Sequence, residues 1–101
     1  MKNLHLVCNA HIDPVWMWNL DEGIAETLST FRVCAEFCEE YDGFIFNHNE
    51  SLLYEWVERY EPALFKRIQK LVKEKKWHIM GGWFIQPDCN IPTGESFVRQ
   101  I

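Results

Sequence analysis

The chain has 101 residues, of which 48% are hydrophobic and 25% are charged, and its formal net charge is −5. This length allows one domain, and the acidic balance argues against a nucleic-acid partner because phosphate binding requires a basic surface. No apolar run has the length of a membrane span, and no charged segment followed by a long apolar stretch indicates a signal peptide.

The first predicted element is a buried strand formed by the apolar run 4–10. Pro14 has no N–H to donate and therefore ends the strand shortly after it. Alternate side chains of a strand project from the same face, so we expect His11 and Asp13 to lie side by side. The pair would then occupy the carboxyl end of a strand, where α/β proteins carry their chemistry.

The chemistry of this pair indicates a metal site. An imidazole beside a carboxylate suits a borderline divalent ion such as zinc. A zinc-binding histidine is neutral and its second ring nitrogen is held by a neighbour, for which Asn9 on the same strand face is one candidate. Trp16 follows closely enough to offer a flat apolar wall to a ligand.

Four further elements are expected in the middle of the chain. A helix capped by Asp21 runs to about Tyr41, because its apolar residues recur at steps of three and four. A short strand follows over 44–48, then a helix over 51–60, and then a helix that begins at Pro62 and ends in a lysine cluster. The inward positions of the first helix are expected to be Ile24, Leu28, Phe31, Ala35 and Cys38.

The last part of the chain contains a third strand over 77–83, a polar loop over 86–92 and a final helix capped by Thr93. The alternation of strands and helices predicts parallel strands joined by right-handed crossovers. Three parallel strands do not close a barrel, so residues 1–101 are expected to be the front end of a longer α/β protein.

The cysteines indicate the compartment. None of the four lies in a C-x-x-C pair, and Cys34 and Cys38 are expected to be core thiols of a helix. Reduced thiols without a signal peptide favour a cytoplasmic location.

Three motifs are spaced along the chain, and they occupy residues 11–16, 54–56, and 81–83 with 86–90 and 93–100. Together they look like the N-terminal part of the α-mannosidases of glycoside hydrolase family 38. The resemblance implies a seven-stranded α/β barrel that binds zinc and hydrolyses α-mannosides of glycans with retention, the chain being a partial β/α barrel with the first three parallel strands.

The resemblance also implies roles for individual residues. His11 and Asp13 match the family's zinc ligands, and Trp16 matches the tryptophan beside the bound mannose. Trp83 and Asp88 fall in a later motif and are assigned to the substrate-binding cleft wall. No catalytic residue is expected in this chain, because the family's nucleophile lies in a later segment. The 101 residues alone are therefore expected to be inactive and to bind zinc weakly.

Several questions stay open at this point. His48 could face the same cleft, Glu50 could cap a helix or take part in catalysis, and Glu95 could serve the last helix, paired with Arg99. Linkage preference stays open, as does whether the full-length protein is a monomer or a homo-oligomer, while the isolated 101 residues are expected to associate through uncovered strand edges. Two other functions compete with the glycosidase: a zinc-dependent deacetylase or amidohydrolase on a similar barrel, and a non-catalytic carbohydrate-binding module.

Overall fold

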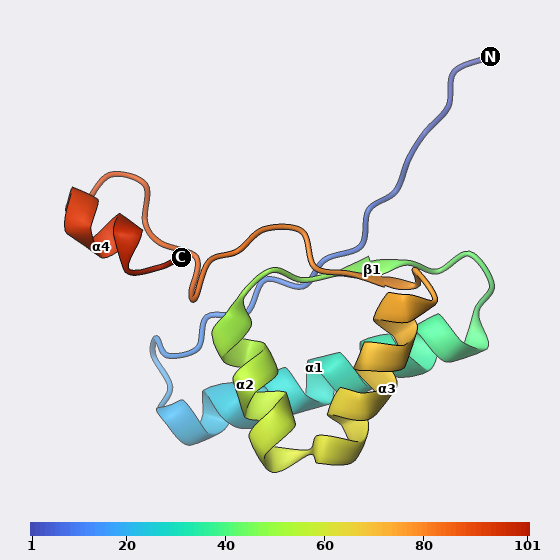
Figure 1. The fold of residues 1–101 in the computed structure, drawn as a ribbon, viewed down its shortest axis with the longest axis horizontal. Helices are drawn as coiled ribbons and strands as arrows, with labels where there is room; N and C mark the ends of the chain where they lie inside the picture. Colours follow the sequence, from blue (N-terminus) through green and yellow to red (C-terminus); the bar gives the residue numbers. More distant parts are fainter.

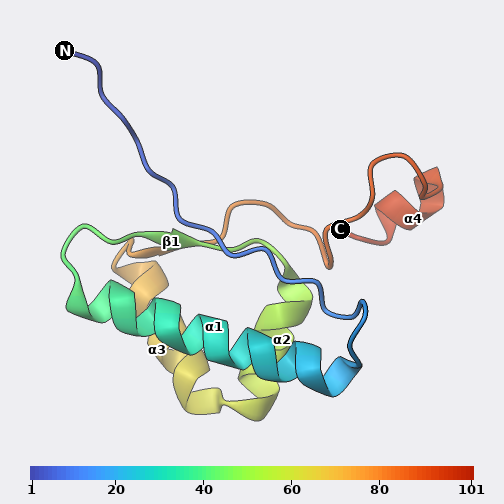
Figure 2. The same cartoon turned by 180° about the vertical axis from the view of Figure 1, so that it is seen from behind.

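The computed structural model describes residues 1–101, and three of its helices lie together on one side of two short strands. Figures 1 and 2 show α1 (Leu20–Glu40), α2 (Ser51–Tyr60) and α3 (Pro62–Lys73) on this side, while the N-terminal segment and α4 (Gly94–Val98) extend away from them. No helix combines the length and the apolar character that a membrane crossing requires. In chain order the elements are α1 (Leu20–Glu40), β1 (Phe46–Asn47), α2 (Ser51–Tyr60), α3 (Pro62–Lys73), β2 (Trp77–His78) and α4 (Gly94–Val98).

The strands are parallel, as the order of elements predicts. Phe46 of β1 pairs with Trp77 of β2, and an isolated parallel bridge joins Phe46 to Cys8. The backbone amide of Asn47 donates to Cys8 O at 3.0 Å. The backbone amides of Phe46 and His48 point the other way and donate to Lys76 O and His78 O, each at 3.1 Å. β1 therefore lies between the N-terminal segment and β2.

The expected strand over 4–10 is wrong in extent, because only Cys8 forms a bridge there. Leu4, Leu6 and Val7 are 84%, 79% and 71% exposed. An apolar sequence supplies side chains suited to a strand, but a strand also needs hydrogen bonds from a neighbouring backbone. The expected strand over 77–83 is likewise reduced to the two residues of β2.

An aromatic core joins the helices to the strands. The ring of Phe31 in α1 lies 5.3 Å from that of Trp77 and 6.5 Å from that of Phe46, and the last two lie 4.5 Å apart. Trp77 also donates its indole N–H to the Tyr54 hydroxyl at 2.8 Å. Burial of each such side chain contributes about 1.5–3 kcal/mol, so this cluster fixes α1 beneath the strands.

The start of α1 differs slightly from expectation. Asn19 is the cap instead of Asp21: its side chain accepts the amide of Glu22 at 3.1 Å, and the Glu22 carboxylate accepts the amide of Asn19 at 3.1 Å. This reciprocal arrangement satisfies two otherwise unpaired backbone donors. It fixes the first turn of α1, on which the preceding segment rests.

Candidate metal and sugar site

The segment after the Cys8 bridge carries the two predicted metal ligands. His11 Nε2 lies 3.2 Å from Asp13 Oδ1, and their side chains are 65% and 39% exposed. Ile12 between them is buried, so successive side chains point to opposite sides as in a strand. The structure thus brings His11 and Asp13 together at the surface.

The separation of the two groups fits a shared zinc ion. Bonds of about 2.0–2.2 Å at tetrahedral angles place two zinc ligands roughly 3.3–3.6 Å apart, and the His11–Asp13 hydrogen bond of 3.2 Å holds the two groups just below this separation. The chain contains no group of three or more His, Cys, Asp or Glu side chains that could hold a metal ion. A zinc ion on this pair would therefore need additional ligands from elsewhere.

Asn9 does not hold the histidine. The side-chain amide nitrogen of Asn9 donates to Asn47 O at 2.8 Å, and the side-chain amide nitrogen of Asn47 donates to Cys8 O at 3.2 Å. These two bonds tie the segment that precedes His11 to β1. Asn9 therefore supports the site by anchoring its backbone.

A compact turn follows the pair and brings two tryptophans beside it. The indole N–H of Trp18 donates to the backbone oxygen of Asp13 at 3.2 Å. The ring centroids of Trp16 and Trp18 lie 6.0 Å apart, with the rings edge to face at 65°. Trp16 is 68% exposed and lines a hollow of about 300 Å³ with Asp13 and Val15. The exposed indole therefore lies beside one predicted metal ligand.

Trp18 was not among the predicted site residues, although it lines a second hollow beside the pair. This hollow has a volume of about 360 Å³, and the carboxylate of Glu26 and the hydroxyl of Thr30 form its α1 side. Thr30 Oγ1 donates to Glu26 Oε1 at 3.3 Å. The sequence did contain a signal for Trp18, namely a second tryptophan two positions after Trp16.

Gly23 allows the turn to rest directly on α1. A Cβ atom at this position would lie 1.9 Å from Pro14 O, which is far inside any permitted contact. Gly23 itself is buried. Sequence reasoning missed it, although a glycine within a helical pattern costs about 0.5–1 kcal/mol relative to alanine and so suggests a packing reason.

His48 belongs to the core. It is 2% exposed, and its ring lies 5.2 Å from that of Phe31. Its Nδ1 accepts the amide of Glu50 at 3.4 Å, and it makes a hydrogen bond with the backbone of Ala10. Burial lowers the pKa of His48 below its usual 6.5, against a smaller opposing effect of the Ala10 bond. It therefore acts as a neutral link between the N-terminal segment and β1.

Glu50 is the N-cap residue of α2, as one of the two open alternatives has it, but its side chain makes no capping hydrogen bond. Its Oε1 accepts the amide of Gln86 at 3.0 Å, whereas its Oε2 is buried and has no partner. Burial raises the pKa of Glu50 above 4.5, and the nearby charge of Asp13 raises it further. The hydrogen bond from Gln86 and the charge of His11 lower the pKa and so oppose the effect of burial. The side chain thus joins the end of β1 to the loop after β2.

The two residues assigned to the cleft wall lie on that loop. Trp83 O accepts the amide of Ser51 at 3.0 Å, which attaches the loop to the start of α2. Asp88 Oδ1 accepts the amides of Asn90 and Ile91 at 2.7 and 3.0 Å. Neither Trp83 nor Asp88 lines a hollow beside the metal-ligand pair. Within this chain the structure therefore does not bring them to it.

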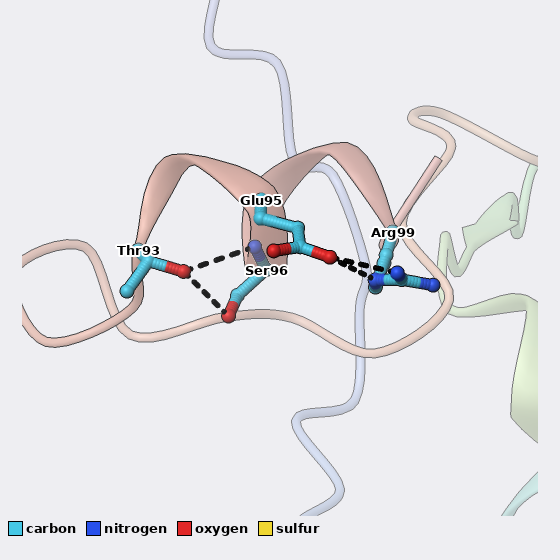
Figure 3. Close-up of polar contacts among 4 residues, drawn as sticks. All are labelled: Thr93, Glu95, Ser96 and Arg99. Atoms are coloured by element: carbon cyan, nitrogen blue, oxygen red, sulfur yellow. Dashed lines mark hydrogen bonds and ion pairs between the residues drawn. The ribbon is translucent and has the colours of Figure 1, made fainter.

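The last helix is organised by local contacts. Thr93 Oγ1 accepts the amide of Ser96 at 3.3 Å, and Arg99 donates to the Glu95 carboxylate at 2.7 Å, as Figure 3 shows. Thr93 is therefore the cap that the sequence predicts, and the expected pairing of Glu95 with Arg99 is confirmed. The Glu95 side chain is 73% exposed, so this pair contributes at most about 1 kcal/mol.

The chain combines short parallel strands backed by helices with an adjacent histidine and aspartate, followed by the exposed Trp16. Residues 1–101 match the glycosyl hydrolases family 38 N-terminal domain, and the chain belongs to this family. The matched family model is named for glycosyl hydrolases, and not for deacetylases or for separate carbohydrate-binding modules.

Named relatives agree with this assignment. The chain is 30% identical over 98 residues to alpha-mannosidase 2C1 of Homo sapiens, and 30% identical over 95 residues to alpha-mannosidase G of Dictyostelium discoideum. These alignments cover 97% and 94% of the chain. The alpha-mannosidase of Saccharomyces cerevisiae is 23% identical over 102 aligned residues. The chain spans 9% of the length of each of these relatives.

Proposed function

We propose that the full-length protein is a zinc-dependent α-mannosidase that hydrolyses mannosides of glycans with retention. In this proposal the strands of this chain are the first part of a β/α barrel, and the protein is cytoplasmic. Family membership and the α-mannosidase names of the relatives support the activity. The observation that carries the site is the 3.2 Å contact of His11 with Asp13 beside the exposed Trp16.

Each residue of the site has a distinct task. His11 offers a ring nitrogen and Asp13 a carboxylate oxygen to zinc, and His11 must be neutral to do so. Bound zinc would supply a Lewis acid that orients the hydroxyl groups of the sugar. The exposed face of Trp16 would pack against the apolar face of the mannose ring and exclude water from that side.

The carboxylates of this chain do not supply the catalytic pair in this proposal. Retention requires one carboxyl group to attack and another, about 5 Å away, to donate a proton. Asp88 is occupied by two backbone amides and Glu95 by Arg99. Glu50 is 4% exposed and is bound to the loop. We therefore assign the nucleophile and the acid to other segments of the full-length protein.

The test removes the two metal ligands in the full-length protein. His11→Ala and Asp13→Ala should each strongly reduce the zinc content and the hydrolysis of a chromogenic α-mannoside, because each removes one ligand from a small set. Zinc is measured by elemental analysis after dialysis, and the anomer released first is identified by NMR.

A matched control is His5→Ala, which removes an exposed histidine from the same N-terminal segment. It should retain both zinc and turnover. Wild-type zinc content and wild-type turnover in His11→Ala and Asp13→Ala would disprove the assignment. Release of the β-anomer first would disprove retention.

A further inference from the structure

Trp18 makes the one side-chain hydrogen bond that closes the turn after Asp13. Its indole N–H donates to Asp13 O at 3.2 Å, five residues back along the chain. A backbone carbonyl fixed in this way also fixes the peptide plane that joins Asp13 to Pro14. Since the carbonyl carbon and the Cβ of Asp13 share one Cα, a fixed plane restricts the direction of the Cα–Cβ bond and so the region that the carboxylate can reach.

The ring of Trp18 makes a second contact with the site. It meets Trp16 edge to face, with ring centroids 6.0 Å apart, in the geometry that aromatic pairs prefer. It also lines the 360 Å³ hollow together with His11 and Asp13. One side chain thus contacts the backbone of one predicted metal ligand and the ring of the predicted sugar platform.

Neither of these partners is held by burial. Trp16 is 68% exposed and the Asp13 side chain is 39% exposed, so the core does not restrict their orientations. Trp18 is 36% exposed and is therefore the better packed of the two tryptophans. Its two contacts add to the packing of Pro14 on Gly23 and link Asp13 to Trp16.

We propose that Trp18 is a positioning residue that sets the direction of both Asp13 and Trp16, through its indole N–H and its ring edge respectively. The inference rests on the proposed function, in which Asp13 binds zinc and Trp16 contacts the sugar. It predicts that metal affinity and substrate affinity depend on different parts of the same side chain. Loss of the N–H should weaken zinc binding, and loss of the ring should weaken sugar binding.

Two substitutions in the full-length protein separate these effects. Trp18→Phe keeps an aromatic edge and removes the N–H, so it should lower zinc affinity by about tenfold, the lower end of the effect of residues that orient metal ligands. Trp18→Leu removes both features, so it should lower zinc affinity equally and also raise KM for the mannoside. Zinc affinity is measured by competition with a chelator, and KM and kcat are measured at saturating zinc.

Trp77→Phe is a matched control because it makes the same chemical change elsewhere. The Trp77 indole N–H donates to the Tyr54 hydroxyl at 2.8 Å, and Trp77 is 1% exposed in the core. This variant should lower the melting temperature while leaving zinc affinity and KM at wild-type values. Trp18→Phe should show the reverse pattern.

Wild-type zinc affinity in Trp18→Phe would overturn the role of the N–H, and an unchanged KM in Trp18→Leu would overturn the role of the ring. Equal losses of zinc affinity in Trp18→Phe and Trp77→Phe would also overturn the inference, since they would reflect general destabilisation. A wild-type protein that binds no zinc through His11 and Asp13 would overturn the proposed function and the inference with it. A wild-type protein that binds zinc there, with Trp18 variants unchanged, would overturn the inference alone.

Discussion

Gly23→Ala is the most direct test of how the site is supported. The added Cβ would lie 1.9 Å from Pro14 O and 2.9 Å from Pro14 C. The carbonyl would have to retreat by about 1 Å or more to reach an ordinary contact distance. Pro14 directly follows Asp13, so this displacement is transmitted to the metal-ligand pair.

The expected cost follows from two opposing effects. Alanine is favoured over glycine within a helix by about 1 kcal/mol, whereas forcing extra atoms into a packed contact costs about 1–3 kcal/mol. We expect a net loss of about 1 kcal/mol in the free energy of unfolding. The effect on mannoside turnover should exceed the effect on stability, because a misplacement of about 1 Å at a reacting centre can reduce rates by about a hundredfold.

The assay compares Gly23→Ala with Gly94→Ala in the full-length protein. Gly94 begins α4, and a Cβ there would meet nothing within 4 Å, so this control should equal or slightly exceed wild-type stability. Unfolding in urea, zinc affinity and mannoside turnover are measured for both variants. A Gly23→Ala protein that matches Gly94→Ala in all three would refute the argument that α1 supports the turn.

Two further predictions concern single side chains. Trp16→Ala should reduce mannoside turnover with little change in melting temperature, because the ring is 68% exposed; a large loss of stability would instead show that Trp16 is a core residue. Glu50→Gln should alter the pH dependence of stability. Burial raises the folded-state pKa of Glu50 above 4.5, so the folded protein binds the proton more tightly and wild-type stability falls as pH rises from about 4.5 through the raised pKa. Urea unfolding across this window should show a smaller fall in the variant, and an unchanged profile would contradict the prediction.

The helices could be predicted from the sequence because their signals are local. The apolar spacing of α1 correctly placed Phe31, Ala35 and Cys38 in the core. Pro62 correctly marked the start of α3. The cap of α1 was misplaced by two residues, because both Asn19 and Asp21 carry suitable oxygens and only Asn19 has a glutamate three residues later.

The strands and the support of the site depend on contacts distant in sequence. The apolar run 4–10 has the composition of a strand, but a strand also needs a neighbouring backbone to bond with. Only Cys8 forms such a bridge, with Phe46 of β1. The sequence marks Gly23 and Trp18 as unusual residues but does not identify their partners, because both partners are backbone carbonyl oxygens, of Pro14 and Asp13. The adjacency of His11 and Asp13, by contrast, follows from the period of two along an extended segment.

These observations assign different roles to the exposed and the buried parts of the site. His11, Asp13 and Trp16 present their functional groups at the surface, where long-range packing does not fix them. Their positions depend on α1, whose first turn is capped by Asn19. The segment after Asp13 packs on this helix where Pro14 contacts Gly23. A functional group must be held within about 0.5 Å of its working geometry. Substitutions at the start of α1 should therefore change the chemistry of the site more than their small effect on stability would suggest.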